Sequence, residues 1–126
     1  MKKVIETTEA PAPIGPYNQA ILVDNTLYAS GQIALNPKTM ELVNEDIQAE
    51  TTQVMKNLSE VLKAAGMDFT NVIKATIYLA DMGDFALVNK VYGGYFNDDD
   101  APARETVQVA QLPKNVRVEI SVIAIL

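Results

Sequence analysis

The chain of 126 residues contains neither cysteine nor histidine. Without these side chains it cannot form a disulfide, a zinc site built from cysteine and histidine, or a nucleophilic triad that depends on either residue. Any catalysis must therefore use carboxylates, lysine, arginine, tyrosine, hydroxyls, backbone groups or water.

Positive charge is also scarce, with 10 lysines and arginines against 16 acidic residues and a net charge of −6. This balance disfavours non-specific binding to nucleic acid, which relies on clustered basic side chains. No glycine-rich phosphate loop or dinucleotide fingerprint is present. The acidic run Asn97–Asp100 lacks the rest of an EF-hand pattern, so no metal site is predicted.

Long apolar runs are missing as well. No stretch of about 18 apolar residues exists, which predicts that the chain has no membrane span. The N-terminus has two lysines but lacks the apolar core of a signal peptide, so we expect a cytoplasmic protein. An apolar content of 48% over this length predicts one folded domain, residues 1–126.

The order of hydrophobic patterns predicts an α+β domain with two helices on one face of a sheet. Helices are expected at residues 46–65, ending before Gly66, and at 84–96 from an N-cap at Asp84. Strands are expected at residues 3–7, 20–23, 27–29 and 72–79, and in the C-terminal segment.

Three finer predictions concern which side chains are buried. Glu50 and Asn57 are assigned to the solvated face of the first helix, while Phe85 is assigned to the buried stripe of the second. Alternation along the expected strand at residues 72–79 places Ile73 on its apolar face and Val72 on its semi-polar face.

The C-terminal segment alternates apolar and polar residues on both sides of a turn at Leu112–Asn115, which predicts a hairpin. In that register Arg104 pairs with Ile123 and Gln108 pairs with Glu119. Arg104 and Glu119 then share a face but lie about 13 Å apart along the strands.

Arg104 and Glu119 are unusual residues in this setting. Arg104 is one of only two arginines, and Glu119 lies in a strand rich in valine and isoleucine. An acid there is costly unless it is paired, hydrated or used in function. The pattern alone favours a structural interpretation, with a surface ion pair and a glutamate at a wet sheet margin.

Short motifs follow one another in order along nearly the whole chain: Ile14-Gly15-Pro16-Tyr17, Ser30-Gly31-Gln32-Ile33, Asn36-Pro37, Ala64-Ala65-Gly66, Asp84-Phe85 with Val88-Asn89, Pro102-Ala103-Arg104 and Val118-Glu119-Ile120. Together they resemble the RidA/YjgF/UK114 family of deaminases that hydrolyse enamines and imines. The resemblance implies a chorismate-mutase-like fold, a homotrimer, 2-imino acid substrates and no cofactor.

The resemblance also implies an active site. Arg104 would bind the substrate carboxylate through two parallel hydrogen bonds, and Glu119 would activate the attacking water. Because the predicted hairpin separates these two residues, we expect them to meet from neighbouring subunits. The residues implied to bind substrate are Tyr17, Ser30, Gly31, Asn89 and Thr106.

Structural alternatives remain open for three of these residues. Tyr17 would merely cover the core, Gly31 would mark a β-bulge, and Asn89 would cap a neighbouring backbone. The chain also departs from the usual family pattern, with Thr106 where many members carry cysteine and Ser121 where many carry a second glutamate.

Two other functions compete with the deaminase. A non-catalytic trimeric regulator of amino-acid (isoleucine) or purine metabolism would bind a metabolite with the same Arg104. A ribonuclease activity attributed to some relatives is disfavoured by the acidic charge and by the absence of histidine.

Overall fold

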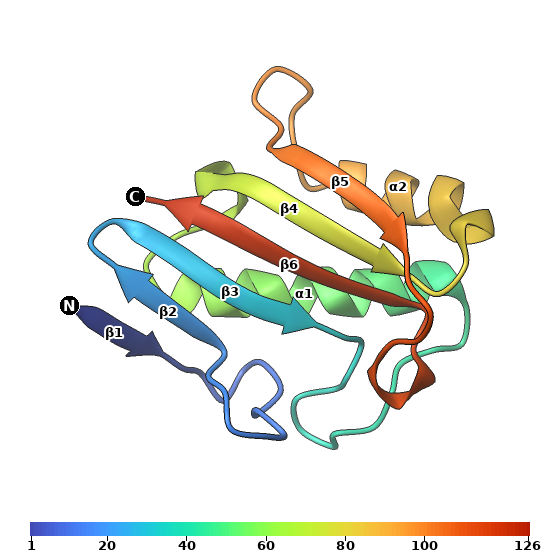
Figure 1. Cartoon of the computed structure of the whole chain (residues 1–126), viewed down its shortest axis with the longest axis horizontal. Coiled ribbons are helices and arrows are strands. Elements are labelled where there is room, and N and C mark those ends of the chain that lie inside the picture. The colour runs from blue at the N-terminus through green and yellow to red at the C-terminus, as the bar shows by residue number, and fades with distance from the viewer.

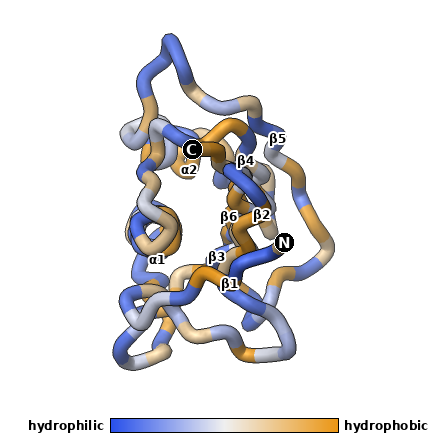
Figure 2. The backbone as a smooth tube through the Cα atoms, turned by 90° about the vertical axis from the view of Figure 1, so that its left-hand side faces the viewer, coloured by the Kyte–Doolittle hydropathy of each residue, from blue (hydrophilic) through white to orange (hydrophobic).

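A computed structural model describes residues 1–126, which form one six-stranded sheet with two helices on one of its faces (Figure 1). The sheet order is β1-β2-β3-β6-β4-β5, and Figure 2 shows α1 standing to one side of the strands. The elements are β1 Lys2–Ile5, β2 Ala20–Val23, β3 Thr26–Gln32, α1 Ile47–Ala64, β4 Val72–Leu79, α2 Phe85–Gly93, β5 Ala103–Gln108 and β6 Val118–Ile125. The predicted α+β architecture is confirmed. Neither helix is both long and apolar enough to cross a membrane.

Helix α1 covers the middle of the sheet and ends where the sequence predicts. The Asp46 carboxylate accepts a hydrogen bond of 2.7 Å from the backbone of Ala49, which caps the first turn. Gly66 has a φ of 74°, a conformation that glycine adopts without strain, and the chain turns there into β4. The buried stripe of the helix includes Val54, Leu58, Val61 and Leu62.

The prediction that Glu50 and Asn57 face solvent is wrong, because each side chain is only 1% exposed. Glu50 accepts hydrogen bonds from the backbone and the side chain of Arg117, at 2.8 and 2.7 Å. Asn57 donates to the carbonyls of Ile33 and Leu35, both at 3.0 Å. Polar side chains at these positions therefore tie α1 to segments beyond the sheet.

Replacing Glu50 with alanine is expected to lower the free energy of unfolding by about 3 kcal/mol, because a buried acceptor of two charge-assisted bonds is lost. Chemical denaturation at a fixed protein concentration measures this loss. Glu60→Ala is the matched control on the same helix, since Glu60 only pairs with exposed Lys63. It should cost less than about 1 kcal/mol. Equal losses in the two variants would contradict a stabilising role for the Glu50–Arg117 pair.

The predicted C-terminal hairpin is also wrong, although both of its strands exist. Strand β5 pairs in parallel with β4, and β4 pairs antiparallel with β6, so β4 lies between the two segments. Arg104 is opposite Ala75, and Glu119 is opposite Tyr78. The connection through α2 allows the parallel β4–β5 pairing, which a short turn could not provide. Alternation predicts a strand and its faces but does not identify the neighbouring strand.

Two local assignments need correction. The β4–β6 register shifts between Val72 and Lys74, so Val72 is buried and Ile73 is 48% exposed, the reverse of the prediction. Helix α2 ends at Gly93, and Phe85 at its start is 36% exposed, while Val88 and Tyr92 are buried. Asp84 occupies the N-cap position but makes no side-chain capping bond.

The buried side chains form two separate clusters. The main core contains 23 residues between the sheet and the helices. A smaller cluster, which we call the satellite cluster, consists of Ile33, Leu35, Leu112 and Val116. It lies where the segments that follow β3 and precede β6 meet.

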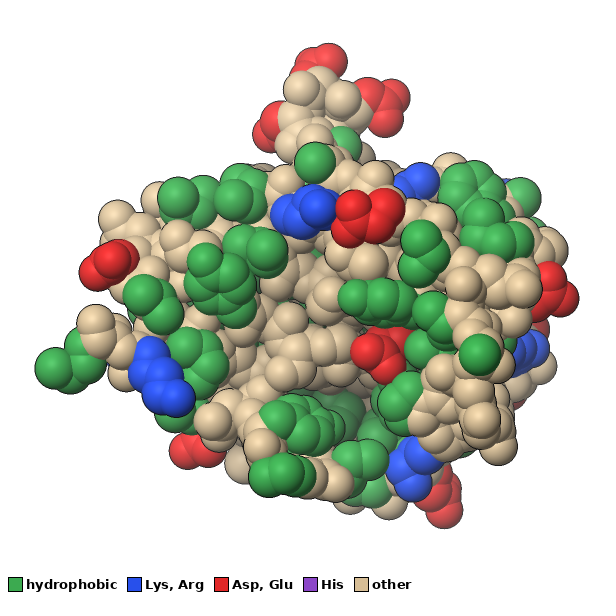
Figure 3. Space-filling view, viewed as in Figure 1, with side chains coloured by type: hydrophobic (Ala, Val, Ile, Leu, Met, Phe, Trp, Pro, Cys, Tyr) green, Lys and Arg blue, Asp and Glu red, His purple; other side chains and the backbone are tan.

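The sheet face opposite the helices, which we call the open face, carries uncovered apolar side chains. They include Tyr28 of β3, Val107 of β5 and Ile125 of β6, each at least 41% exposed. Figure 3 shows hydrophobic side chains spread across this face with few charged groups between them. Such a surface is typical of a region covered by another protein chain.

Candidate active site

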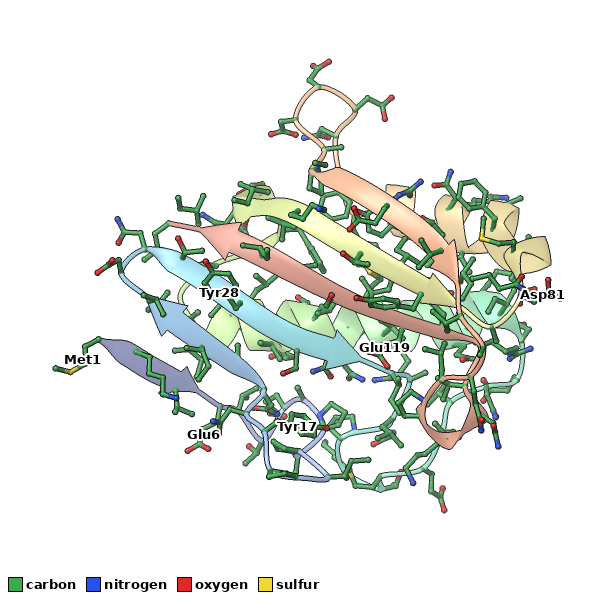
Figure 4. All side chains as sticks on the ribbon, in the orientation of Figure 1. Met1, Glu6, Tyr17, Tyr28, Asp81 and Glu119 are labelled. Carbon is green, nitrogen blue, oxygen red and sulfur yellow. The ribbon has the colours of Figure 1, made fainter.

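A cavity of about 180 Å³ lies at the end of β3, between the proline-rich loop 9–17 and β6. Tyr17, Gly31 and Glu119 all line it, so the structure brings three of the predicted site residues together. Figure 4 shows Glu119 on β6 above the loop that carries Tyr17. The remaining lining residues include no lysine or arginine: Pro11, Ala12, Ile14, Gln19, Gln32, Ile33, Leu35 and Pro113.

Glu119 is the only charged side chain that lines this cavity. It points to the open face, since its neighbours Val118 and Ile120 are buried beneath the sheet. Burial raises the pKa of Glu119 above the usual value of 4.5, and no basic group or hydrogen-bond donor of the chain opposes this effect. A carboxyl group with a raised pKa and no protein partner is well suited to exchange a proton with a bound water.

Gly31 allows the close approach of Glu119. It lies in an irregularity of β3, where the pairing with β6 shifts between Ala29 and Gln32. A β-carbon at Gly31 would stand 2.8 Å from Cδ and 3.0 Å from Cγ of Glu119. The two interpretations of Gly31 are therefore compatible, since the residue belongs to a bulge and also lines the cavity.

Gln19, whose role carries no signal in the sequence, fixes the loop that holds Tyr17. Its buried amide accepts from the backbone of Thr7 at 2.7 Å and donates to the carbonyls of Thr7, Ala10 and Pro11. Tyr17 itself is 48% exposed, so it does not cover the core. Its hydroxyl accepts a bond of 3.4 Å from the backbone of Ile14.

Ser30 lies beside the cavity but does not line it. Its hydroxyl donates to the carbonyl of Asn18 at 2.6 Å, which joins β3 to the segment that follows Tyr17. Asn57 of α1 supports the opposite wall through the carbonyls of Ile33 and Leu35. Through these bonds Ser30 and Asn57 hold in place the backbone segments that border the cavity.

Arg104, Asn89 and Thr106 form a second group, outside the cavity. The Arg104 guanidinium donates from Nη1 to Oδ1 of Asn89 at 2.6 Å. Its carbon Cζ lies 5.1 Å from the ring centre of Tyr92 and 5.7 Å from that of Phe85. Asn89 therefore bonds a side chain and does not cap a backbone. The Thr106 hydroxyl is buried without a hydrogen-bond partner.

Within one chain the two groups lie on opposite sides of the sheet. The Arg104 side chain points towards α2, whereas the Glu119 side chain points to the open face of the sheet. Strand β4 separates them, and the positions opposite them on β4 are Ala75 and Tyr78. Their backbones are therefore about 10 Å apart along β4 and a further two strand spacings, about 10 Å, across the sheet. A small molecule cannot contact both residues of one chain.

A family model described as endoribonuclease L-PSP matches residues 7–126. The mouse protein named 2-iminobutanoate/2-iminopropanoate deaminase is 54% identical, over 99% of this chain and 92% of its own length. This chain belongs to the RidA/YjgF (L-PSP) family. The family resemblance found in the sequence is thereby confirmed.

Solved structures of RidA/YjgF relatives have the same fold. RidA from an Antarctic Psychrobacter species is 42% identical with a TM-score of 0.94, covering 98% of this chain and 99% of that chain. The Escherichia coli protein TdcF, in a crystal structure with bound serine, is 40% identical with a TM-score of 0.92, covering 98% of each chain. The six-stranded sheet with two helices is thus the fold of solved RidA/YjgF-family structures.

The description of the family model names an endoribonuclease. The cavity is lined by no basic residue, and the chain as a whole has a net charge of −6. Binding of a phosphate backbone depends on lysine and arginine. No three acidic side chains gather where they could hold a metal ion.

Proposed function

We propose that this protein is a 2-iminobutanoate/2-iminopropanoate deaminase, which hydrolyses 2-imino acids to 2-keto acids and ammonia. The mouse and human relatives with this name are 54% and 51% identical over 99% of the chain. The observation that carries the proposal is the unpartnered Glu119 carboxyl, with its raised pKa, in a small and largely apolar cavity. Such a group can activate water in a space sized for a short metabolite.

We further propose that the active site lies between subunits of a homotrimer. The distance between Arg104 and Glu119 within one chain supports this arrangement, because neither residue can complete the site alone. The apolar side chains on the open face provide a surface for assembly. The Arg104–Asn89 group of one subunit would then face the Glu119 cavity of the next.

Arg104 would recognise the substrate carboxylate. Asn89 occupies Nη1, which leaves Nε and Nη2 available for two parallel hydrogen bonds to the two carboxylate oxygens. The backbone N–H groups of Gly31 and Thr106 would orient the substrate, with Tyr17 as a wall and Ser30 fixing the strand beside it. This arrangement would bring the imine carbon next to the Glu119 carboxyl.

The proposed chemistry needs only water and one carboxyl group. Glu119 takes a proton from water as the oxygen attacks the carbon of the C=N bond, giving a tetrahedral carbinolamine. Glu119 returns this proton to the nitrogen, then takes the proton of the carbinolamine hydroxyl and delivers it to the same nitrogen, so that the C–N bond breaks and ammonia leaves as the C=O bond forms. An enamine substrate must first tautomerise to the imine. The imine carbon is already electrophilic, so the proposed mechanism includes no cofactor.

A coupled assay tests the proposal. A pyridoxal-phosphate-dependent threonine dehydratase releases 2-aminocrotonate and its imine, and formation of 2-oxobutanoate is followed with and without this protein. We expect keto-acid formation to accelerate in proportion to the protein added. An unchanged rate at every concentration would contradict the proposed activity.

The same purified protein distinguishes the deaminase from the competing function, a non-catalytic regulator. The E. coli relative TdcF was crystallised with bound serine, an amino acid that is not an imine. A regulator of this kind would bind a carboxylate-bearing metabolite without accelerating imine hydrolysis. Calorimetric binding of 2-oxobutanoate, compared with the rate of the coupled assay, separates binding from turnover.

Gly31→Ala is expected to lower kcat by about 100-fold, because the added methyl group displaces the Glu119 carboxyl that it would otherwise overlap. The coupled assay measures the loss. Gly93→Ala is the control, since a β-carbon there meets no atom within 4 Å. If Gly31→Ala retained the activity of the unmodified protein, the position of Glu119 beside Gly31 would not matter for catalysis.

A further inference from the structure

The Arg104 guanidinium is surrounded by three side chains of one helix. Phe85, Asn89 and Tyr92 follow one another at spacings of four and three residues, so they share one face of α2. Asn89 accepts from Nη1 at 2.6 Å, and the rings of Phe85 and Tyr92 lie 5.7 and 5.1 Å from Cζ. Helix α2 therefore determines how the guanidinium is oriented.

Among these three, Tyr92 alone is removed from solvent. Its side chain is 5% exposed, whereas Phe85 is 36% exposed and Asn89 lies at the surface. Tyr92 also packs against Phe96, with ring centres 4.8 Å apart. A residue buried in this way has no direct route to a substrate, so any effect on catalysis must pass through Arg104.

The contact between Tyr92 and Arg104 is made by the ring. The Tyr92 hydroxyl is buried and has no hydrogen-bond partner. Burial raises the pKa of Tyr92, while the Arg104 charge acts in the opposite direction, so the phenol stays neutral at physiological pH. A neutral ring attracts a guanidinium through its π-face, and the attraction is stronger when both groups are partly desolvated.

We propose that Tyr92 is a positioning residue, which holds the guanidinium of Arg104 so that Nε and Nη2 face the substrate carboxylate. This inference rests on the proposed function, because it assigns a support to the group that binds substrate there. Arginine has many rotamers, and fixing one before binding reduces the entropy lost when the carboxylate binds. The effect should therefore appear in substrate affinity and leave the chemical step at Glu119 unaffected.

Tyr92→Leu tests this role in the coupled assay. We expect KM for the imine to rise about tenfold, with kcat within a factor of about two, because the cation–π contact is lost while Glu119 is untouched. Tyr92→Phe should restore KM, since it keeps the ring and removes only the unpartnered hydroxyl. A large fall in kcat with Tyr92→Phe would show that the hydroxyl takes part in the chemistry and would overturn the proposal.

Phe96→Leu is the matched control for packing. Phe96 contacts the same Tyr92 ring but is not among the rings that face Arg104. Its substitution should lower thermal stability as Tyr92→Leu does and leave KM unchanged. If both leucine variants raised KM equally, Tyr92 would have only a structural role, and the proposal would fail.

Two further measurements keep the test decisive. If Tyr92→Leu does not fold, a ring-fluorinated phenylalanine at position 92 keeps the shape but weakens the attraction, so KM should rise relative to Tyr92→Phe. Binding of 2-oxobutanoate, measured by calorimetry, should rank the Tyr92 variants in the same order of affinity, and this measurement needs no turnover. A protein that lacks deaminase activity but shows this order would refute the proposed reaction and retain the role of Tyr92. An equal affinity in all variants would refute that role.

Discussion

Replacing Glu119 with glutamine is expected to lower kcat for imine hydrolysis by about 100-fold or more, because the side chain can no longer take a proton from water. Glutamine keeps the shape of the side chain beside Gly31, so substrate binding should be retained. The coupled assay gives the rate, and calorimetry with 2-oxobutanoate gives the affinity. A variant that hydrolyses imines at the original rate would remove Glu119 from the mechanism.

The same substitution should make the folded protein more stable at pH 7. Since the pKa of Glu119 is raised in the folded state, the folded protein holds this proton more tightly than the unfolded chain does. Ionisation of Glu119 therefore lowers stability as pH rises through the folded-state pKa, and glutamine cannot ionise. The difference in thermal midpoint between the two proteins should disappear below the usual pKa of 4.5, where Glu119 is neutral in both states.

Activity should show the complementary pH dependence. Glu119 must be ionised to act as a base, so kcat/KM is expected to fall as pH decreases through its raised pKa. The acidic limb should consequently lie above pH 4.5. A limb at or below that value would mean that substrate or a neighbouring subunit lowers the pKa of Glu119.

Replacing Arg104 with lysine is expected to lower kcat/KM by about 100-fold, while the protein remains folded. Lysine cannot form two parallel bonds to one carboxylate, and a lost charge-assisted bond costs about 1.5–3 kcal/mol, or about 10- to 100-fold. Lysine also lacks the flat guanidinium that lies over the Tyr92 ring. Steady-state kinetics in the coupled assay, with circular dichroism as the test of folding, measures the effect.

Arg117→Lys is the matched control, because Arg117 is the only other arginine and lies in the pair with Glu50. It should reduce stability and leave KM unchanged. If Arg104→Lys retained full activity, the substrate carboxylate would be bound by some other group. If both variants lost activity equally, general destabilisation would explain the result.

The sequence was sufficient to predict the elements that carry a strong local signal. The apolar stripe of α1 shows the period of a helix, and Gly66 ends it. The strands expected at residues 20–23 and 27–29 are present as β2 and β3, which pair with each other. The partner of β5 was not predictable in this way, because the alternation of apolar and polar residues along a strand does not depend on which strand lies beside it.

Buried polar residues were the main source of error. Glu50, Asn57 and Gln19 resemble ordinary surface residues in sequence, yet each is 1% exposed and satisfied by backbone groups. The sequence contains only a weak signal for the burial of Glu50. Arg117 is one of two arginines in the chain and precedes a buried strand, where an arginine needs an acidic partner. The partner itself lies 67 positions away, beyond any local pattern.

The candidate site likewise has a part that the sequence identified and a part that it did not. Resemblance identified Tyr17, Gly31 and Glu119, and the structure groups them around one cavity. It also identified Arg104 and Asn89, and the structure joins them by a hydrogen bond. The role of α2 in holding Arg104 was not visible in the sequence, because the rings of Phe85 and Tyr92 have the spacing of ordinary core residues.

The satellite cluster has a consequence for how such a protein can diversify. Ile33 and Leu35 line the cavity, yet they pack with Leu112 and Val116 and not with the 23 residues of the main core. Part of the cavity wall is therefore formed by side chains that lie outside the main core. A lineage with this architecture can change the length of metabolite it accepts while its scaffold stays the same.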